Sequence, residues 1–518
     1  MGVTLLTRPL LPVDETRYVS VAWEMWARDD FWVPYLNGST YSHKPPLFFW
    51  LMQLSWWLFG VNEWTPRLIA PAFSLAAVFL SASVARLLWP GRDQPVTLTP
   101  LILFGFFFWI IYSTLMMFDM MLAFFALLGI YSVLKAAYSG MNFGRWLLMG
   151  VAIGGGVLTK GPVILLHVLP VALLAPWWRD RQQGPVINWL NWYFGIFLGV
   201  IAGAAIALAW AIPAGMAGGE AYRNAIFFGQ TGGRLIKSFA HRLPWWWYVQ
   251  SLPVLLLPWL LWRPLWRAVR QLQLDNGLRF CLSWLLPVFI AFSLISGKRM
   301  HYLLPLMPGL ALCLARAVDG IETFEWEKAH RLFVAFIAFV ACGLIILPSL
   351  NDYWQWSPEL SNLSPLWGVL LGLSAAALWL DKASTPAQSA FNICAGALAL
   401  VIVLATGFFE IRGARYDVTE PARKIAGLLA ENREVVYFRK YHGQYNFSGR
   451  LPRGLKVTDN PIAWAQTHPE GFVAVVFKDN KELPGQWFFY RHPFRNRTMA
   501  LVSAKRLLEN QTMLSVFR

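Results

Sequence analysis

Long apolar segments recur along most of the chain and are separated by short polar turns. A bilayer core needs about 20 consecutive apolar residues in a helix that crosses it. Between residues 64 and 409, twelve segments reach or approach this length. The twelve predicted helices are 64–88, 98–117, 120–138, 146–159, 162–178, 191–212, 245–262, 278–296, 302–318, 332–349, 366–381 and 388–409. The pattern predicts a mainly α protein built as a polytopic transmembrane helical bundle.

The two ends of the chain differ from this bundle. Residues 46–60 are apolar and rich in Trp and Phe but too short for a span, so they predict a helix lying in the membrane interface. Residues 410–518 are polar and basic, and they contain a helix-like stretch and three strand-like runs, at 420–431, 434–438, 472–477 and 486–490. We therefore expect three regions, namely a polar loop with interfacial helices (1–63), the bundle (64–409) and a small α/β domain outside the membrane (410–518).

Composition supports a membrane protein. The chain is 57% hydrophobic and 14% charged, with a mean hydropathy of +0.46, whereas a soluble domain carries about 25% charged residues. The net charge of +16 does not indicate nucleic acid, because many basic residues lie in short turns between apolar segments. The four cysteines lie in apolar runs without the spacing of a disulfide framework or a metal site. No glycine loop for a nucleotide cofactor is present, since Gly154 to Gly156 lie within a predicted span and suggest close helix packing.

The basic residues also predict an orientation. If 64–88 runs inward, the inner turns carry most of the Lys and Arg residues, as the positive-inside rule requires. These inner residues are Arg86, Arg92, Lys135, Arg145, Arg179, Arg181, Arg263, Arg267, Arg270, Arg316, Lys328, Arg331 and Lys382. Asp14 then lies outside, yet the residues before it are too few for a span, so we expect a missing first helix. If 46–60 crosses the membrane, the parity reverses and Asp14 lies on the inner side.

A charged loop precedes the first span. It begins with Asp14 and Glu15, followed by Arg17 and Tyr18. Charged groups are costly to keep beside a membrane and indicate a functional site. One carboxylate, Asp14 first, would accept a proton from an incoming hydroxyl, while Arg17 would bind the donor phosphate in bidentate fashion, with Tyr18 as a further contact to that phosphate. The alternative is that both acids only stabilise the dipole of a helix that starts here.

The second half of this loop contains His43 and Lys44 before Pro45 and Pro46. The two prolines fix the backbone and disfavour a helix at the preceding residue, so the Lys44 ammonium is held on a rigid elbow that suits a phosphate. The alternative is an interfacial lysine that only snorkels. His43 and His241 form a candidate pair for a divalent metal ion, completed by a carboxylate. A lone histidine is usually not a ligand, so the metal stays an open alternative.

Further charged residues lie at outer turns, where the positive-inside rule does not explain the cations. Asp119 stands between two spans, either as a second acid of the site or as a helix cap. Lys160 lies at one outer turn, and Lys298 and Tyr302 lie at another. They indicate a path for an anionic headgroup, or else the capping of helix ends.

These motifs, taken in order, resemble a known class of enzymes. The ordered set is Asp14-Glu15-x-Arg17-Tyr18, Lys44-Pro45-Pro46-Leu47, Asp119, Leu158-Thr159-Lys160-Gly161-Pro162 and Tyr302-Leu303-Leu304-Pro305. It is similar to that of GT-C class membrane glycosyltransferases, above all the bacterial lipid A aminoarabinose transferases and their protein mannosyltransferase-like relatives. The likeness extends over nearly the whole chain.

The resemblance implies an enzyme that moves a sugar from undecaprenyl phosphate, or a similar polyprenyl phosphate, to an acceptor on the periplasmic side of the bacterial inner membrane. By that likeness Asp14 is the main catalytic acid, Asp119 is the second acid, and Lys44 and Arg17 contact the phosphate. The relatives usually carry a metal-binding glutamate where His43 stands, and a histidine there removes a negative charge. The chemistry predicts direct displacement with inversion at the anomeric carbon, because a phosphate held by cations leaves readily.

Two other classes remain as alternatives. A transporter of a lipid-linked or anionic substrate would show internal repeats and broken helices at mid-membrane, whereas the charges here gather at outer turns. A purely structural membrane subunit would not need the acids beside Lys44. The sugar and the acceptor, which could be lipid A, another glycolipid, a polysaccharide or a protein, are left open by the sequence.

Overall fold

The computed structural model describes residues 2–180, 182–229, 243–321, 324–357, 359–478, 484–513 and 517. They form two compact units. The helical unit comprises Met1–Thr4, Ser42–Phe48 and Arg67–Ala405, and the mixed unit comprises Leu5–Tyr41, Phe49–Pro66 and Thr406–Arg518.

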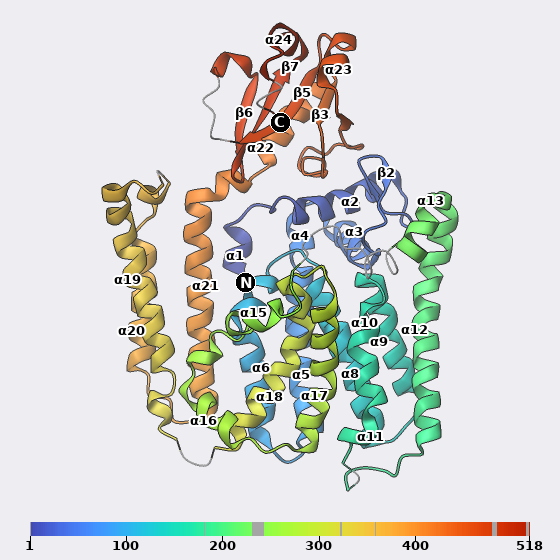
Figure 1. Ribbon diagram of the computed structural model, residues 1–518, viewed down its shortest axis with the longest axis vertical. Coiled ribbons are helices and arrows are strands. Elements are labelled where there is room, and N and C mark those ends of the chain that lie inside the picture. Colours follow the sequence, from blue (N-terminus) through green and yellow to red (C-terminus); the bar gives the residue numbers. More distant parts are fainter. Residues whose placement is uncertain are drawn as a thin grey trace. The chain divides into compact units, whose positions relative to one another are not determined.

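The helical unit is a bundle whose long helices run side by side (Figure 1). Within the described residues, seven helices are long and apolar enough to cross a membrane, or up to eight if the bent pair α6–α7 counts as one span. The main helices are α5 (Ile69–Leu88), α6 (Asp93–Gly105), α7 (Phe107–Ser113), α8 (Asp119–Ser139), α9 (Phe143–Lys160), α10 (Val163–Leu173), α12 (Trp189–Ala217), α17 (Asn276–Leu294), α18 (Met307–Asp319), α19 (Arg331–Trp354), α20 (Leu366–Leu380) and α21 (Pro386–Tyr416). The prediction of a multi-span membrane protein is confirmed.

Shorter elements connect these helices. They are α11 (Ala175–Trp178), α13 (Gly219–Asn224), α15 (Trp247–Leu255) and α16 (Arg263–Gln271), the π-helical turn η1 (Ala225–Gly229), and the 3-10 turns η2 (Trp259–Leu261), η3 (Met300–Leu306), η4 (Trp326–Lys328) and η5 (Leu360–Asn362).

Each of the twelve predicted segments contains helix, but several are broken. The segment 98–117 bends by 66° between α6 and α7. The segment 162–178 divides into α10 and α11. The segment 245–262 divides at Leu256 to Pro258, just after Pro253 inside α15. Proline removes a backbone donor and clashes with the preceding turn, so the apolar pattern overestimates the number of full spans.

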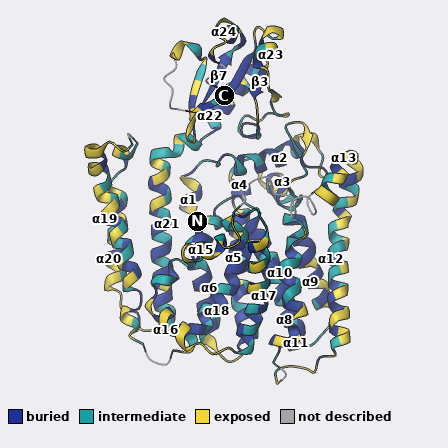
Figure 2. Cartoon of the chain, in the orientation of Figure 1, coloured by how far each residue is buried: buried dark blue, intermediate teal, exposed yellow. Residues whose placement is uncertain are grey.

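Burial separates central from peripheral helices. In its most apolar window α8 is 72% buried within the protein, whereas α12 and α19 are only 28% buried. Figure 2 shows the same contrast, with many exposed residues on α12, α19 and α20. Exposed apolar helix faces are those that lipid would cover.

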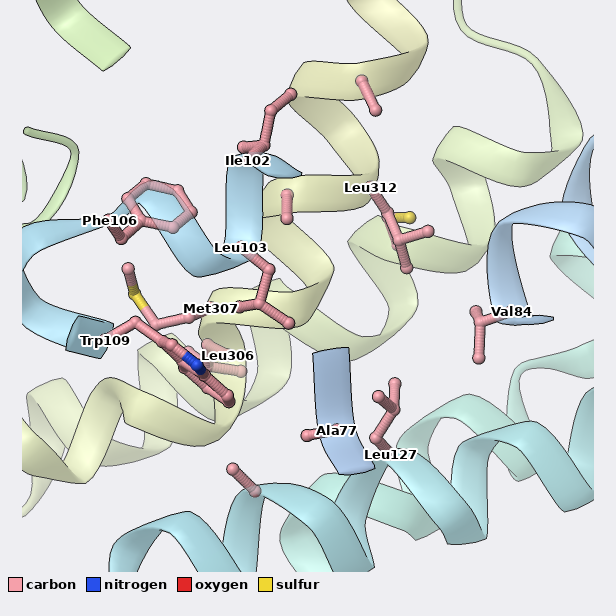
Figure 3. Close-up of a cluster of buried hydrophobic side chains, with 14 of the residues drawn as sticks. Ala77, Val84, Ile102, Leu103, Phe106, Trp109, Leu127, Leu306, Met307 and Leu312 are labelled. Atoms are coloured by element: carbon pink, nitrogen blue, oxygen red, sulfur yellow. The ribbon is translucent and has the colours of Figure 1, made fainter. Parts of the chain in front are cut away.

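The interior of the helical unit is tightly packed. Figure 3 shows one part of it, where Leu103 of α6, Trp109 of α7 and Met307 of α18 lie together. The interface of α9 with α12 depends on small residues, as predicted for the glycine run. A Cβ atom on Gly150 would come within 2.6 Å of Ala202, and one on Gly154 within 2.7 Å of Ile206. Between helices in lipid, close backbone approach of this kind supplies the packing energy.

The mixed unit contains a five-stranded sheet in the order β4-β3-β5-β7-β6. Its strands are β3 (Val435–Phe438), β4 (Lys456–Thr458), β5 (Phe472–Lys478), β6 (Tyr490–Phe494) and β7 (Arg497–Ser503). β3 is parallel to β4 and β5, whereas β7 is antiparallel to β5 and β6. The expected α/β domain is confirmed, but residues 485–487 form the 3-10 turn η6 (Gly485–Trp487), and the strand expected at 486–490 begins only at Tyr490.

Helices cover both faces of this sheet. Val435 and Tyr437 pack in one cluster with residues of α22 (Thr419–Ala430). Val436 and Phe438 pack in a second cluster with residues of α23 (Pro461–Thr467) and α24 (Ala504–Glu509). Alternate side chains of a strand point to opposite faces, so β3 contributes to both cores.

The amino-terminal segment belongs to the same unit as this sheet. After the short α1 (Gly2–Leu6), it contains α2 (Asp14–Arg28), the hairpin of β1 (Tyr35–Leu36) and β2 (Ser39–Thr40), α3 (Leu47–Phe59) and α4 (Trp64–Arg67). The Ser20 hydroxyl donates to the Gly443 carbonyl at 2.7 Å, and the Trp56 ring stacks on Phe447 at 5.3 Å. The structure thus packs most of region 1–63 with region 410–518, which the sequence division had kept apart.

Candidate functional site

The helical unit contains a cluster of charged and aromatic side chains, which we call the lysine cluster: Lys44, Asp119, Lys160, His301 and Tyr302. The Lys160 Nζ atom donates to Asp119 Oδ1 at 2.6 Å, and the two side chains are 13% and 3% exposed. Lys160 Nζ also lies 4.8 Å from the centre of the Tyr302 ring. Lys44 and His301 both interact electrostatically with the Asp119 carboxylate. The structure therefore brings together three residues that the sequence singled out at separate turns, Asp119, Lys160 and Tyr302, together with Lys44.

Local structure explains why the central pair forms. Asp119 is the first residue of α8, and Lys160 is the last residue of α9. The two helices pack against each other and are joined by a short turn, so the start of α8 lies beside the end of α9. Each charge also lies at the end of its helix dipole that favours it. Gly161, with a φ of 83°, ends α9 immediately after the lysine.

The lysine cluster carries an excess of positive charge. Asp119 contributes one negative charge, whereas Lys44 and Lys160 contribute two positive charges. Lys44 is further held by the Phe118 ring, whose centre lies 5.2 Å from Nζ. A buried ion pair is costly to desolvate unless its charges are well matched. Two ammonium groups in one cluster suit an arriving anion such as a phosphate.

The mixed unit contains a second cluster, which we call the α2 cluster: Asp14, Arg17, Tyr18, Tyr41 and His442. Arg17 forms an ion pair with Asp14, and its guanidinium lies 5.4 Å from the centre of the Tyr18 ring. Burial raises the pKa of Tyr18, and the neighbouring Asp14 carboxylate raises it further, so the hydroxyl stays protonated. Burial lowers the pKa of His442, and Arg17 contributes in the same direction.

The two adjacent acids of this region have different surroundings. Glu15 accepts hydrogen bonds from Arg8 at 2.5 and 2.8 Å and from the Leu11 amide at 2.8 Å, and both charged side chains are 3% exposed. Asp14 is 43% exposed. An incoming hydroxyl could reach Asp14 far more easily than Glu15. Catalysis by Glu15 stays a prediction that this geometry does not favour, and the residue is better explained as an anchor for the start of α2.

Lys298 is bound differently from the other lysines. Its ammonium donates to the carbonyl oxygens of Leu243 at 3.1 Å and of Ile295 at 2.5 Å, and the residue is 3% exposed. These contacts cap the end of α17, which is the alternative role weighed for it in the sequence. Phosphate binding by Lys298 remains a prediction without further support.

The metal prediction gains no support from the described residues. His43 is exposed, and His241 lies outside the part of the chain that the structure describes. Within that part, no group of three or more His, Cys, Asp or Glu residues is close enough together to hold a metal ion. Because His241 lies outside the described residues, a metal ion at His43 and His241 stays a prediction, and the proposed reaction does not use it.

Comparison with known proteins supports the resemblance seen in the motifs. Residues 43–210 match the family model of dolichyl-phosphate-mannose-protein mannosyltransferases. The chain is 27% identical over 524 residues to an undecaprenyl phosphate-alpha-4-amino-4-deoxy-L-arabinose arabinosyl transferase of Yersinia pestis, with 92% of this chain and 91% of the relative covered. A protein of the same name from Serratia proteamaculans is 25% identical, with 93% of each chain covered.

The fold of the chain also matches that of a protein of known structure. The crystal structure of ArnT from Cupriavidus metallidurans bound to undecaprenyl phosphate matches with a TM-score of 0.75 at 20% identity, covering 96% of this chain and 95% of that chain. The predicted likeness to GT-C class, aminoarabinose transferase-like proteins is confirmed. The match covers both the helical bundle and the carboxyl-terminal α/β domain of this chain.

Two residues of the α2 cluster were missed as site residues by the sequence reasoning. His442 lies more than 420 residues from Asp14 in the sequence, and no local motif marks it. Tyr41 stands in the polar loop just before His43. Its place close to the rigid elbow of Pro45 and Pro46 is the one signal that could have identified it.

Proposed function

We propose that this protein is an integral-membrane glycosyltransferase that moves a sugar from an undecaprenyl-phosphate donor to a lipid A-like or other periplasmic acceptor. The observation that carries the proposal is the buried Lys160–Asp119 pair with Lys44 beside it, a cation-rich cluster suited to the phosphate of such a donor. The names of the relatives, which match over nine tenths of the chain, support the same donor class. Because these relatives are transferases, we set the transporter alternative aside.

Lys44 and Lys160 act on the leaving group. During transfer the bond between the anomeric carbon and the phosphate oxygen breaks, and its electron pair stays on the phosphate. The two ammonium groups stabilise the growing negative charge, and electrostatic stabilisation of this kind commonly contributes more to catalysis than any other effect. Asp119 holds Lys160 in place and reduces the cost of keeping two cations close together.

Asp14, Arg17 and Tyr18 of the α2 cluster act on the acceptor. By the resemblance of the motifs, Asp14 is the base that takes the proton of the acceptor hydroxyl, whose oxygen forms the new bond to the anomeric carbon. Arg17 orients Asp14 through their ion pair. The protonated Tyr18 hydroxyl supplies a hydrogen-bond donor. A single displacement of this kind inverts the anomeric configuration.

The orientation in the membrane belongs to the same proposal. α8, α17 and α21 each have one end that lies away from the lysine cluster. The turns at these ends are rich in arginine and lysine. By the positive-inside rule those turns face the cytoplasm. The lysine cluster and the carboxyl-terminal domain would then face the periplasm of a bacterial inner membrane.

The test is sugar transfer by purified protein in proteoliposomes that contain an undecaprenyl-phosphate sugar and a lipid A acceptor. We expect Asp14→Asn and Lys44→Ala each to lower kcat by about 100-fold or more, as for removal of a catalytic base or of a charge-stabilising group. Asp29→Asn is the matched control for the acid, because Asp29 is exposed at the end of α2 with a φ of 55°, which asparagine adopts readily. Lys382→Ala, an exposed lysine of the helical unit, is the control for Lys44. Unchanged transfer by folded Asp14→Asn or Lys44→Ala would refute the assigned roles.

A further inference from the structure

The short helix α16 lies at the end of the helical unit opposite the lysine cluster. α17 starts at Asn276, soon after α16, and leads through its 19 residues toward η3. η3 contains Tyr302, which lies against Lys160. At 1.5 Å per residue, α17 separates its two ends by about 28 Å. A ligand-binding site at α16 is therefore separate from the proposed site of sugar transfer.

α16 is strongly amphipathic. Pro264, Leu265 and Ala268 are buried on the side that packs against α18. Trp266 and Val269 are each 56% exposed. Tryptophan is enriched where a membrane meets water, and a short helix with one buried apolar side and one cationic side is typical of an element lying in that interface.

The cationic side of α16 borders a cavity of about 480 Å³. Arg263, Arg267 and Arg270 line it at intervals of four and three residues, which places them on one face of the helix. Its other lining residues are Trp266, Gln271 and Phe324. Of the described residues that line this α16 cavity, three carry a positive charge and none carries a negative one.

The aromatic wall of the cavity is fixed in position. The Trp266 indole N–H donates to the Leu260 carbonyl at 2.9 Å. Phe324 packs against Trp326, with ring centres 5.3 Å apart. These rings offer an apolar surface directly beside the three guanidinium groups.

Three described carboxylates at this end of the helical unit pair with cations outside the cavity. Glu325 pairs with Lys328 at 3.0 Å, Asp275 pairs with Arg316 at 2.6 Å, and Asp319 pairs with Arg92 at 2.9 Å. Among these acids Glu325 interacts with Arg263 as well, but it is exposed and already bonded to Lys328. Three guanidinium groups on one helix face suit an oxygen-rich anion such as a phosphate.

We propose that the α16 cavity binds the phosphodiester headgroup of an anionic phospholipid from the surrounding bilayer. Guanidinium groups bind phosphate oxygens in bidentate fashion, and basic pockets between helices at the membrane surface bind such headgroups. The Trp266 and Phe324 rings contact the glycerol and the first methylene groups of the lipid. A soluble phosphate would use the guanidinium groups but not this apolar wall.

The test measures lipid binding without any sugar donor, so that it is independent of the proposed transfer. Purified protein is placed in nanodiscs of phosphatidylcholine with phosphatidylglycerol, and the lipids retained after transfer to detergent are counted by native mass spectrometry. We expect wild-type protein to retain phosphatidylglycerol over phosphatidylcholine. The triple variant Arg263→Gln/Arg267→Gln/Arg270→Gln should lose at least about tenfold in this preference.

A charge-matched control separates the cavity from the general positive charge of this end of the bundle. Arg86→Gln/Lys135→Gln/Lys382→Gln removes the same formal charge from the same end of the helical unit but leaves the cavity unchanged, and it should retain the lipid. If the triple cavity variant does not fold, the single substitution Arg267→Gln, with an expected loss of a few fold, gives the same reading.

Three outcomes would overturn the proposal. The first is that the cavity variant binds phosphatidylglycerol as wild-type protein does. The second is that the control variant loses its preference for phosphatidylglycerol to the same extent as the cavity variant. The third is that glycerol 1-phosphate at equal concentration displaces the lipid completely. The last result would assign the cavity to a free phosphate instead of a headgroup.

Discussion

Replacing Asp119 by alanine leaves the Lys160 ammonium without the carboxylate that it contacts at 2.6 Å. Removing one partner of a buried ion pair typically costs about 3–5 kcal/mol, because the remaining charge stays desolvated. The Lys160 side chain keeps 13% exposure and can gain some water, so we expect a loss at the low end, about 3 kcal/mol. At about 2 °C per kcal/mol for a large domain, the melting temperature should fall by about 6 °C.

The assay is thermal unfolding of purified protein in detergent, followed by tryptophan fluorescence. Glu220→Ala is the control, because Glu220 is an exposed acid in the first turn of α13 and its loss should cost less than about 1 kcal/mol. The double variant Asp119→Ala/Lys160→Met removes both charges and fills the space of the lysine stem. We expect it to regain most of the melting temperature while transfer remains lost, since Lys160 is proposed to hold the phosphate. A melting temperature of Asp119→Ala within about 1 °C of wild type, or a double variant less stable than the single one, would refute this reasoning.

Three further predictions concern the mixed unit. Glu15→Gln weakens the bidentate contact with Arg8 and should lower the free energy of unfolding by about 2 kcal/mol, measured by thermal unfolding. Sugar transfer per folded molecule should change by less than about threefold. A loss of transfer as large as that expected for a catalytic base would restore Glu15 to that role. Folding lowers the pKa of His442, so as the pH falls through the ordinary histidine value of about 6.5 the unfolded chain takes up a proton before the folded protein does. The free energy of unfolding should therefore decrease toward about pH 5.5, and His442→Asn should make this pH dependence weaker. An unchanged pH dependence in the variant would contradict the assignment. Trp56→Ala removes a buried ring stacked on Phe447 and should cost about 3–5 kcal/mol, seen as faster proteolysis of the amino-terminal segment, and wild-type resistance would show that this stack does not hold the segment to the sheet.

The sequence is sufficient for the helical bundle and for the central pair of the lysine cluster. Asp119 and Lys160 are 41 residues apart and flank two helices joined by one turn. Such a hairpin returns the chain to its starting end, so the two charges meet through local connectivity alone. Lys44 was predicted as a phosphate contact from its position before two prolines, without knowledge of its place beside Phe118.

Other features depend on contacts that the sequence does not encode locally. The different exposure of Asp14 and Glu15 arises from Arg8, which selects one of two adjacent acids. The hydrogen bond of Ser20 to Gly443 joins residues 423 positions apart, so the common unit of the amino-terminal segment and the sheet was not predictable. The break between α6 and α7 was missed because the apolar pattern continues through it.

A single displacement on an undecaprenyl-phosphate sugar is tested most directly by the stereochemistry of its product. Purified protein in proteoliposomes would be given the labelled donor, and the anomeric configuration of the transferred sugar and the undecaprenyl phosphate released would be measured by NMR and mass spectrometry. We expect one undecaprenyl phosphate per sugar transferred and a configuration opposite to that of the donor. Retention of configuration, or release of undecaprenyl phosphate without transfer to any acceptor, would contradict the proposed displacement.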